Sequence, residues 1–260
     1  MIRAMWSAAT GMNAQQMMID VMANNLANVN TAGFKKSRAN FEDLFYATTR
    51  EAGAPTAAGG TVPVGIQVGM GTSPVSVEKI FTQGDYLETQ SDLDLAIEGD
   101  GFFLLVSEDR EVYTRDGSFK TDSDGYIVNS RGDRLQPDFA VPEETASVVI
   151  SKDGEIACLS NDDEVIATGQ IPTYTFTNPA GLKALGMNAF IPTEASGDPI
   201  EGIPGTDNFG TIAQGYLEMS NVNAIEEMIN MIVGQRAYEI NSKSIKTADT
   251  MLGVVTSLSR

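Results

Sequence analysis

The chain has 260 residues and a net charge of −18 at pH 7, with no histidine and one cysteine. The absence of histidine excludes histidine-dependent catalytic triads and His-ligated zinc sites, and Cys158 alone can form neither an intrachain disulfide nor a thiolate cluster. The strong negative charge disfavours nucleic acid and anionic membrane surfaces, which bind proteins through Lys and Arg.

The N-terminus shows no export signal of the cleaved type. Residues Met1–Ser7 carry one basic side chain but lack the block of 7–15 apolar residues that a secretory signal needs. The longest uninterrupted apolar run, Phe102–Val106, is far below the roughly 20 residues that span a bilayer. We therefore expect no membrane span, and export by a route without signal cleavage if the protein leaves the cytoplasm.

The first 30 residues contain a heptad repeat. One series recurs every seven residues and a second follows it by three: Met5, Met12, Ile19 and Leu26, then Ala8, Gln15, Met22 and Val29. Such a seam predicts a helix that pairs with another helix. Asparagines then weaken the helix and Gly33 suits a left-handed stop, so the helix should end between Asn28 and Gly33.

Residues 46–63 are rich in Ala, Gly and Thr, and they predict an extended connector that includes Tyr46, Pro55 and Pro63. Residues 69–74 begin like a dinucleotide-binding fingerprint. Pro74 occupies the sixth position, however, and no strand-then-helix context surrounds the motif, so we discount it.

The middle of the chain has the composition of a β domain. Short apolar runs at 101–106, 112–114, 126–129 and 148–151 are separated by glycine and aspartate turns such as Asp116-Gly117. These features predict a mainly antiparallel, β-rich domain.

Several acidic or turn motifs in this region have a functional and a structural interpretation. Asp122–Gly125 resembles a calcium loop, but Lys120 and Arg131 stand where that loop needs carboxylates, so a hairpin turn is favoured. Arg131–Asp133 also fits a tight turn better than an adhesion motif. The acidic pairs could in principle supply a glycosidase acid and base, although acidic runs are usually solvated: Asp92 with Asp94, Glu98 with Asp100, Asp162 with Asp163.

The C-terminal residues predict one long amphipathic helix. Apolar and small side chains follow a period of 3.6 residues: Val222, Ile225, Ile229, Val233, Ala237, Ile240, Ser244, Ala248, Met251, Val255 and Leu258. Asn223, with Glu226 three residues later, predicts the N-cap. Residues 1–40 have a small positive net charge and residues 219–260 have a net charge of zero, so the middle of the chain has a net charge of −21. This distribution suggests that the two ends contact protein.

Two arrangements of the end helices are open. They could form a simple hairpin buried against the β domain. Alternatively, they pair with each other and present a second face to neighbouring copies, since small residues such as Ala9, Ala23 and Ser244 permit close helix approach. A heterologous contact that does not close into a ring generates an open helical array.

Three blocks of residues resemble the rod and hook family of axial proteins of the bacterial flagellum. Residues 23–35, with their asparagine-rich helix end, are similar to the N-terminal signature of that family. Gly99–Phe103 resembles its β-domain strand motif, and residues 214–239 resemble its C-terminal signature. The length, Phe81–Asp85 and residues 239–249 are most similar to the members that build the distal part of the rod.

This resemblance implies an α+β fold in which long N- and C-terminal helices pair as a coiled coil. Residues 1–33 with 221–260 would form the inner helical domain, 34–80 an extended connector and β-hairpin, 81–191 the β-rich outer domain and 192–220 the return connector. The helix seams and the asparagines would form the assembly interface: Met5, Met12, Ile19, Met22, Asn24, Asn25, Leu26, Asn28, Val222, Ile225, Ile229, Val233, Ala237, Ile240, Ala248, Met251 and Val255.

The resemblance also implies a structural role without catalysis, cofactor, metal or small-molecule substrate. Copies of the chain would polymerise helically into the hollow driveshaft that crosses the periplasm and transmits torque. The expected partners are other copies, proximal rod proteins, the hook protein or hook-cap side, bushing ring proteins where present and the flagellar export apparatus. The alternatives are a proximal rod or short hook-like protein, and an acidic secreted enzyme acting on glycan.

Overall fold

The computed structural model describes residues 2–53, 63–107, 110–162, 164–206 and 209–258. The chain divides into two compact units. The helical unit comprises Met1–Leu26, Ser37–Glu78 and Asn223–Arg260, and the β-domain comprises Ala27–Lys36 and Lys79–Val222. Loop 27–36 therefore belongs with the β-domain, although it directly follows the N-terminal helix.

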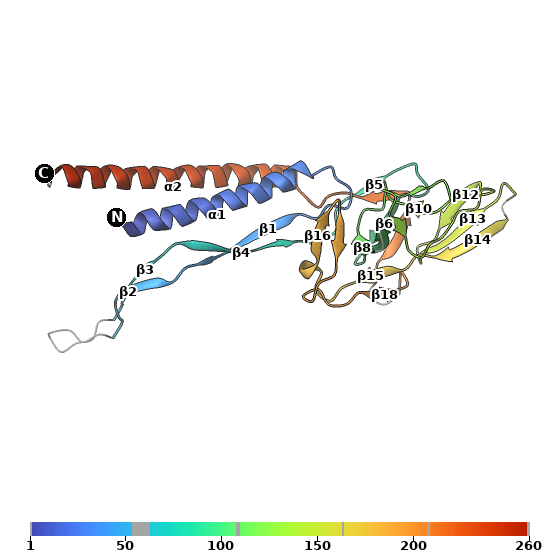
Figure 1. Cartoon of the computed structure of the whole chain (residues 1–260), viewed down its shortest axis with the longest axis horizontal. Coiled ribbons are helices and arrows are strands. Elements are labelled where there is room, and N and C mark those ends of the chain that lie inside the picture. Colours follow the sequence, from blue (N-terminus) through green and yellow to red (C-terminus); the bar gives the residue numbers. More distant parts are fainter. Residues whose placement is uncertain (1, 54–62, 108–109, 163, 207–208, 259–260) are drawn as a thin grey trace. The chain divides into compact units, whose positions relative to one another are not determined.

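The helical unit contains a long helix from each end of the chain and a β ribbon (Figure 1). This confirms the predicted terminal helices. Its elements are α1 (Ile2–Ala27), β1 (Ser37–Asp43), β2 (Tyr46–Arg50), β3 (Ile66–Gly69), β4 (Thr72–Lys79) and α2 (Ala224–Leu258).

The ends of both helices follow local chemistry. α1 stops at Ala27, one residue before the predicted range, because a turn in which Thr31 N donates to Asn28 O at 3.2 Å replaces the helix. Val29, predicted as the last seam position, therefore lies beyond the helix. At the start of α2, Asn223 Oδ1 accepts hydrogen bonds from the amides of Ile225 and Glu226 at 3.0 and 3.3 Å, which confirms the predicted N-cap.

The ribbon consists of two-stranded pairings, β1 with β4 and β2 with β3. The part of the predicted connector that starts at Tyr46 is thus strand β2, which pairs antiparallel with β3 from Tyr46↔Gly69 to Arg50↔Ile66. Pro55 lies outside the described residues, and Pro63 is exposed. α1 lies between α2 and the ribbon, and the Thr72 amide of β4 donates to Thr10 Oγ1 of α1 at 3.4 Å (Figure 1).

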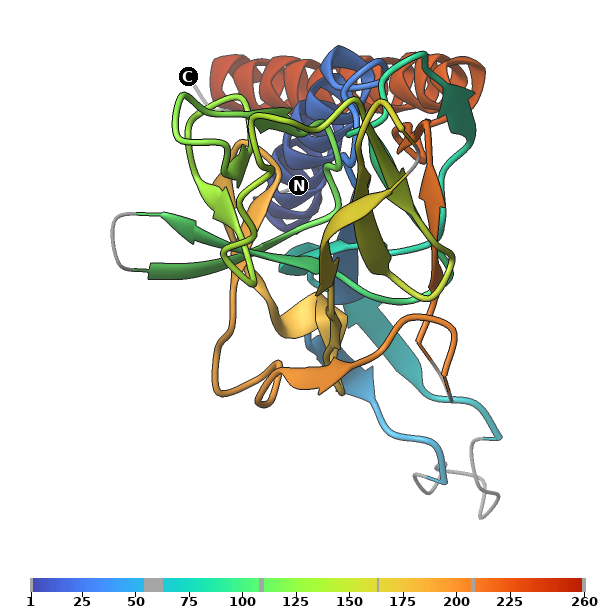
Figure 2. The same ribbon diagram turned by 90° about the vertical axis from the view of Figure 1, so that its right-hand side faces the viewer.

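The β-domain is built from antiparallel pairs, as the sequence predicts. Its largest sheet has seven strands in the order β16-β17-β8-β7-β11-β10-β9. These strands are β7 (Phe103–Ser107), β8 (Arg110–Thr114), β9 (Lys120–Thr121), β10 (Ile127–Val128), β11 (Arg134–Leu135), β16 (Lys183–Gly186) and β17 (Ala189–Ile191). In Figure 2 the β7–β8 hairpin, in green, extends to one side of the domain.

Smaller sheets complete the β-domain. One has the order β12-β13-β14, and three are pairs, β15 with β18, β19 with β6 and β20 with β5. A short 3₁₀ turn, η1, covers Pro179–Gly181. The strands are β5 (Tyr86–Glu88), β6 (Leu95–Glu98), β12 (Ser147–Ile150), β13 (Glu155–Leu159), β14 (Val165–Gln170), β15 (Thr173–Thr175), β18 (Ile200–Gly202), β19 (Thr211–Gln214) and β20 (Tyr216–Glu218).

Two apolar clusters form the core of the β-domain. The larger packs aliphatic side chains of β6, β7 and β13, such as Ile97, Leu105 and Ile156, around Phe103 and Phe119. The smaller is aromatic, with Phe102, Tyr113, Tyr174, Phe176 and Phe190 in edge-to-face contacts. Successive residues of β7 pack alternately into the larger and the smaller cluster, because neighbouring side chains on a strand point to opposite faces.

Within the described ranges, no helix is both long enough and apolar enough to cross a membrane.

Candidate assembly interface

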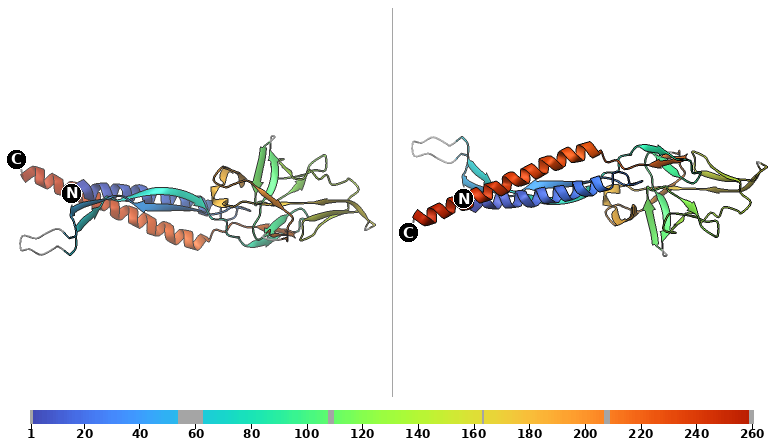
Figure 3. Two further views of the ribbon diagram at one scale, coloured as in Figure 1. Left: turned by 90° about the horizontal axis from the view of Figure 1, so that it is seen from below. Right: turned by 90° about the horizontal axis from the view of Figure 1, so that it is seen from above.

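The two long helices pack against each other in antiparallel fashion (Figure 3). A β-carbon placed on Gly11 of α1 would lie 2.9 Å from Asn241 Nδ2 of α2. A β-carbon placed on Gly234 of α2 would lie 3.3 Å from Ile19 Cγ1 and 3.5 Å from Gln15 Oε1 of α1. The helices therefore approach closely at glycines.

The face of α2 that is covered within the chain is small and polar. Its buried positions are Glu227, Gly234 and Ala248, and the half-buried Asn241 continues their spacing. They recur every seven residues, as positions facing one partner helix do. Met231, Ile245 and Leu252 flank them and are half-buried.

The apolar stripe predicted on α2 lies largely on a different face, in solvent. Ile225, Val233 and Ile240 are 67%, 60% and 65% exposed, and Ile229, Met251 and Val255 are likewise exposed. Fully burying one such side chain contributes about 1.5–3 kcal/mol. The folded chain thus leaves a long apolar stripe of α2 without a partner among its described residues.

The remaining predicted interface residues are distributed over several environments. On α1, Met22 is buried, and Met5, Met12, Ile19 and Leu26 are half-buried. Val222 and Ala248 are buried, and Ala237 and Asn28 are half-buried. The role of these residues in contacts between copies stays a prediction.

Of the two adjacent asparagines near the end of α1, one has an evident structural role. Asn25 is 1% exposed, its Nδ2 donates to Ser37 O and its Oδ1 accepts from Ser37 N, both at 2.9 Å. The amide side chain thereby pairs with the backbone at the start of β1 as a neighbouring strand would. Asn24, by contrast, is exposed. No pattern in the sequence distinguishes the buried asparagine from the exposed one.

The β ribbon also exposes apolar side chains. Phe45 is 91% exposed, and Val64, Ile66, Val75 and Val77 are exposed as well. A two-stranded ribbon is marginally stable in water by itself. These residues form a second apolar surface of the helical unit, which sequence analysis did not single out.

The motifs with a structural interpretation are indeed turns. Asp122–Gly125 joins β9 to β10, with the Gly125 amide donating to Asp122 O at 2.9 Å. In the second motif, Asn129 Oδ1 accepts from the amides of Arg131 and Asp133 at 2.9 and 3.0 Å, and Asp133 is buried.

The acidic pairs lie mainly in solvent. Asp92, Glu98, Asp100 and Asp162 are exposed and Asp94 is half-buried, whereas Asp163 is outside the described residues. No group of three or more metal-ligating side chains occurs in the part of the chain that the structure describes.

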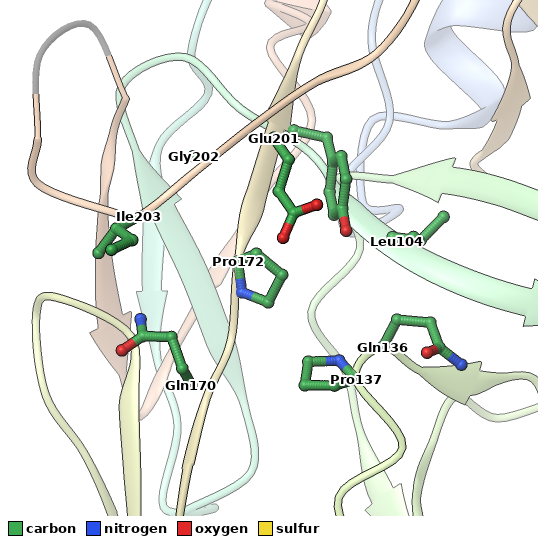
Figure 4. Close-up of a pocket in the computed structure, with 9 residues that line it drawn as sticks. Leu104, Gln136, Pro137, Gln170, Pro172, Glu201, Gly202 and Ile203 are labelled. Atoms are coloured by element: carbon green, nitrogen blue, oxygen red, sulfur yellow. The ribbon is translucent and has the colours of Figure 1, made fainter.

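A pocket of about 610 Å³ lies in the β-domain between Pro137, Pro172 and Ile203 (Figure 4). Its polar side chains contact other protein groups. Gln170 Nε2 donates to Asp153 O at 2.6 Å and Gln136 Nε2 to Asp138 Oδ1 at 2.8 Å. Burial, followed by the charge of Glu201, raises the pKa of Tyr174 to about 12, so this hydroxyl stays protonated at neutral pH.

Comparisons with known proteins match most of the chain to flagellar axial families. Residues 5–35 match the flagella basal body rod protein family, residues 96–158 the flagellar hook protein FlgE/F/G D1 domain, and residues 213–258 the flagellar basal body rod FlgEFG protein C-terminal family. The three blocks noted in the sequence fall mainly within these ranges.

Curated relatives match over the full length. The flagellar basal-body rod protein FlgG of Borreliella burgdorferi is 50% identical, with 100% of each chain covered. FlgG of Buchnera aphidicola is 46% identical over 97% of this chain and 98% of its own. The flagellar hook protein FlgE of Borreliella burgdorferi is 44% identical over 52% of this chain and 31% of its own. The chain therefore belongs to the flagellar basal-body rod family, structural and non-enzymatic proteins of the flagellum, and within it to the distal rod proteins named FlgG.

Proposed function

We propose that this chain polymerises helically into the distal part of the flagellar rod, the hollow driveshaft that links the motor to the hook and transmits torque. The exposed apolar stripe of α2 carries the proposal, because a folded chain that leaves Ile225, Ile229, Val233 and Ile240 in water gains free energy when a neighbouring copy covers them. The full-length similarity to FlgG proteins supports the same function.

In the assembled rod, α1 and α2 act as a coiled-coil pair in an inner layer around the channel. The covered face of α2, a seam formed by Glu227, Gly234, Asn241 and Ala248, packs close to α1. The apolar stripe on the other face of α2 contacts adjacent copies. The asparagines and half-buried methionines of α1 join the same interface. The β ribbon, with its exposed Phe45, Ile66 and Val75, provides a second contact surface, and residues 46–63 make the rod stiff.

The partners follow from this position in the flagellum. Proximal rod proteins lie on one side, the hook protein or hook-cap side on the other, and bushing ring proteins surround the rod where they are present. The rod crosses the periplasm, and the subunits reach it through the flagellar export apparatus without a cleaved signal.

Electron microscopy of isolated basal bodies tests the proposal. Deleting the gene in its own bacterium should give basal bodies with a truncated rod and no hook, and a plasmid copy should restore both. A plasmid copy with Ile229→Asp and Val233→Asp should not restore them. Complete rods in the deletion strain would contradict the proposal.

A further inference from the structure

The β-domain contains a buried cluster of three charged side chains. Lys35 Nζ lies 2.5 Å from Glu218 Oε1, and Arg115 Nη1 lies 3.3 Å from Glu218 Oε2. The side chains of Lys35 and Glu218 are 0% exposed and that of Arg115 is 3% exposed. Two cations thus share one carboxylate in the interior. Arg115 also donates to Gly99 O at 2.7 Å and to Ile97 O at 3.3 Å.

This cluster holds loop 27–36 on the β-domain. Lys35 comes from the loop and also donates to Thr82 O at 2.8 Å. Glu218 of β20 contacts the loop a second time, because its carbonyl accepts from Gly33 N at 2.7 Å. Its carboxylate accepts in addition from Gly84 N at 3.0 Å. Three segments that are distant in the sequence therefore meet at Glu218.

Asn221 ties together the same segments. Its Oδ1 accepts from Lys36 N at 2.7 Å, and its Nδ2 donates to Ile80 O at 2.9 Å and Thr82 O at 3.0 Å. The Ile80 amide donates to Lys36 O at 2.9 Å and Lys79 Nζ to Lys35 O at 3.2 Å.

These contacts coincide with the places where the chain leaves the β-domain. The β-domain ends at Lys36, begins again at Lys79 and ends once more at Val222. Asn221 therefore binds Lys36 and the Lys35 carbonyl binds Lys79, the terminal β-domain residues of two of the four connections to the helical unit. Asn221 itself directly precedes the third connection, at Val222.

A buried ion pair is a poor source of net stability, since removing charges from water costs about as much as their attraction returns. Its better-attested effect is to make one arrangement much more favourable than its alternatives. A displaced Lys35 would be a charge without its partner, and Glu218 Oε1 and Thr82 O would each lose a charged donor. We propose that Lys35, Glu218, Arg115 and Asn221 act as positioning residues, a clamp that fixes the course of loop 27–36 and of the connecting segments on the β-domain.

The proposal goes beyond rod assembly and concerns the single chain, so it can be tested whether or not the chain polymerises. Hydrogen–deuterium exchange with mass spectrometry on the full-length monomer measures how firmly loop 27–36 and the connecting segments are held. The reporters are the amides of Gly33, Lys36, Ile80 and Gly84, and the internal reference is the core strand β13.

Lys35→Met is the informative variant, because it removes the tether yet leaves Glu218 and Arg115 as a balanced pair. Peptides covering 27–36 and 79–84 should exchange at least about tenfold faster, as expected for the loss of buried hydrogen bonds to a charged group, with β13 unchanged. Asn221→Ala should give the same pattern. Lys120→Met removes the same charge from an exposed position of β9 and should change neither region.

Coupling between the two charges provides a second readout. Glu218→Gln should accelerate exchange of the loop less in the Lys35→Met background than in the natural chain, because only one cation then loses its partner. Three results would each overturn the proposal: equal effects of Glu218→Gln in both backgrounds, loop exchange that stays at the natural rate in Lys35→Met, or loss of protection in the loop and in β13 together in Lys35→Met.

Discussion

Gly234 of α2 lies directly against Ile19 of α1, with little room for a side chain between them: a β-carbon at Gly234 would approach Ile19 Cγ1 to 3.3 Å. Glycine in the middle of a helix costs about 1 kcal/mol relative to alanine. The close approach of the helices explains why α2 contains it. It also identifies the seam of α2 as a face distinct from the apolar stripe.

Replacing this glycine with a large side chain should separate the helices. Gly234→Leu is expected to lower the midpoint of thermal unfolding of the helical unit, followed by circular dichroism at 222 nm. Gly253 is the matched control, since no atom lies within 4 Å of its β-carbon position. Gly253→Leu should raise helix stability by up to about 1 kcal/mol, as propensity alone predicts. Equal shifts for both variants would contradict the seam.

Asn25→Ala removes both hydrogen bonds that the buried Asn25 side chain makes with the Ser37 backbone. The free energy of unfolding should fall by about 1–3 kcal/mol in urea titrations. Asn13→Ala, at an exposed position of α1, should have no effect or should stabilise slightly through helix propensity. If Asn25→Ala behaves like Asn13→Ala, the Asn25–Ser37 pairing does not hold the start of β1.

The two ends of the chain illustrate what the sequence could predict. Periodicity located both helices, although α1 ends at Ala27, before the predicted range of Asn28 to Gly33. Asn223 marked the start of α2, because local hydrogen bonding determines caps. The seam of α2 could not be found in this way. Gly234 and Asn241 contribute no hydrophobicity, so the apolar pattern identified the stripe that faces water instead.

No sequence pattern predicted the clamp either. Lys35, Arg115 and Glu218 read as ordinary surface charges, since charged residues are rarely buried unless paired. Their pairing depends on the tertiary fold, because Lys35 and Glu218 are 183 positions apart in the sequence. Turn motifs such as Asp122–Gly125 were predictable because Asp and Gly act through their own backbone.

Glu218→Gln should destabilise the β-domain strongly. Lys35 and Arg115 would then be two buried cations without the carboxylate that they share, and breaking a buried pair costs about 3–5 kcal/mol. Urea unfolding at pH 7 measures the loss. Adding Lys35→Met to the same chain should recover part of it, because one of the uncompensated charges is removed. A loss under 1 kcal/mol for Glu218→Gln, on the order of a surface pair, would contradict the burial of this cluster.

Alkaline pH should unfold the β-domain through its buried tyrosines. Burial, followed by the charge of Glu111, raises the pKa of Tyr113 to about 12 from the ordinary value of 10.0. Between these values the folded chain holds the proton that the unfolded chain releases, so stability is complete below pH 10 and falls as the pH rises towards 12. Tyr113→Phe should make this fall less steep, by at most about 1.4 kcal/mol per pH unit. Urea midpoints of the natural chain and of the variant at pH 9, 10 and 11 measure this difference. An equal fall of the midpoint with pH in both chains would contradict the raised pKa of Tyr113.

Negative-stain electron microscopy of the purified chain at high concentration, beside the Ile229→Asp, Val233→Asp double variant, tests whether the exposed stripe of α2 drives assembly. Because both positions are more than half exposed, the variant should keep the circular dichroism spectrum and unfolding midpoint of the natural chain. We expect straight rods from the natural chain and monomers from the variant. Rods from both chains, or monomers from both, would contradict a role for this stripe in polymerisation.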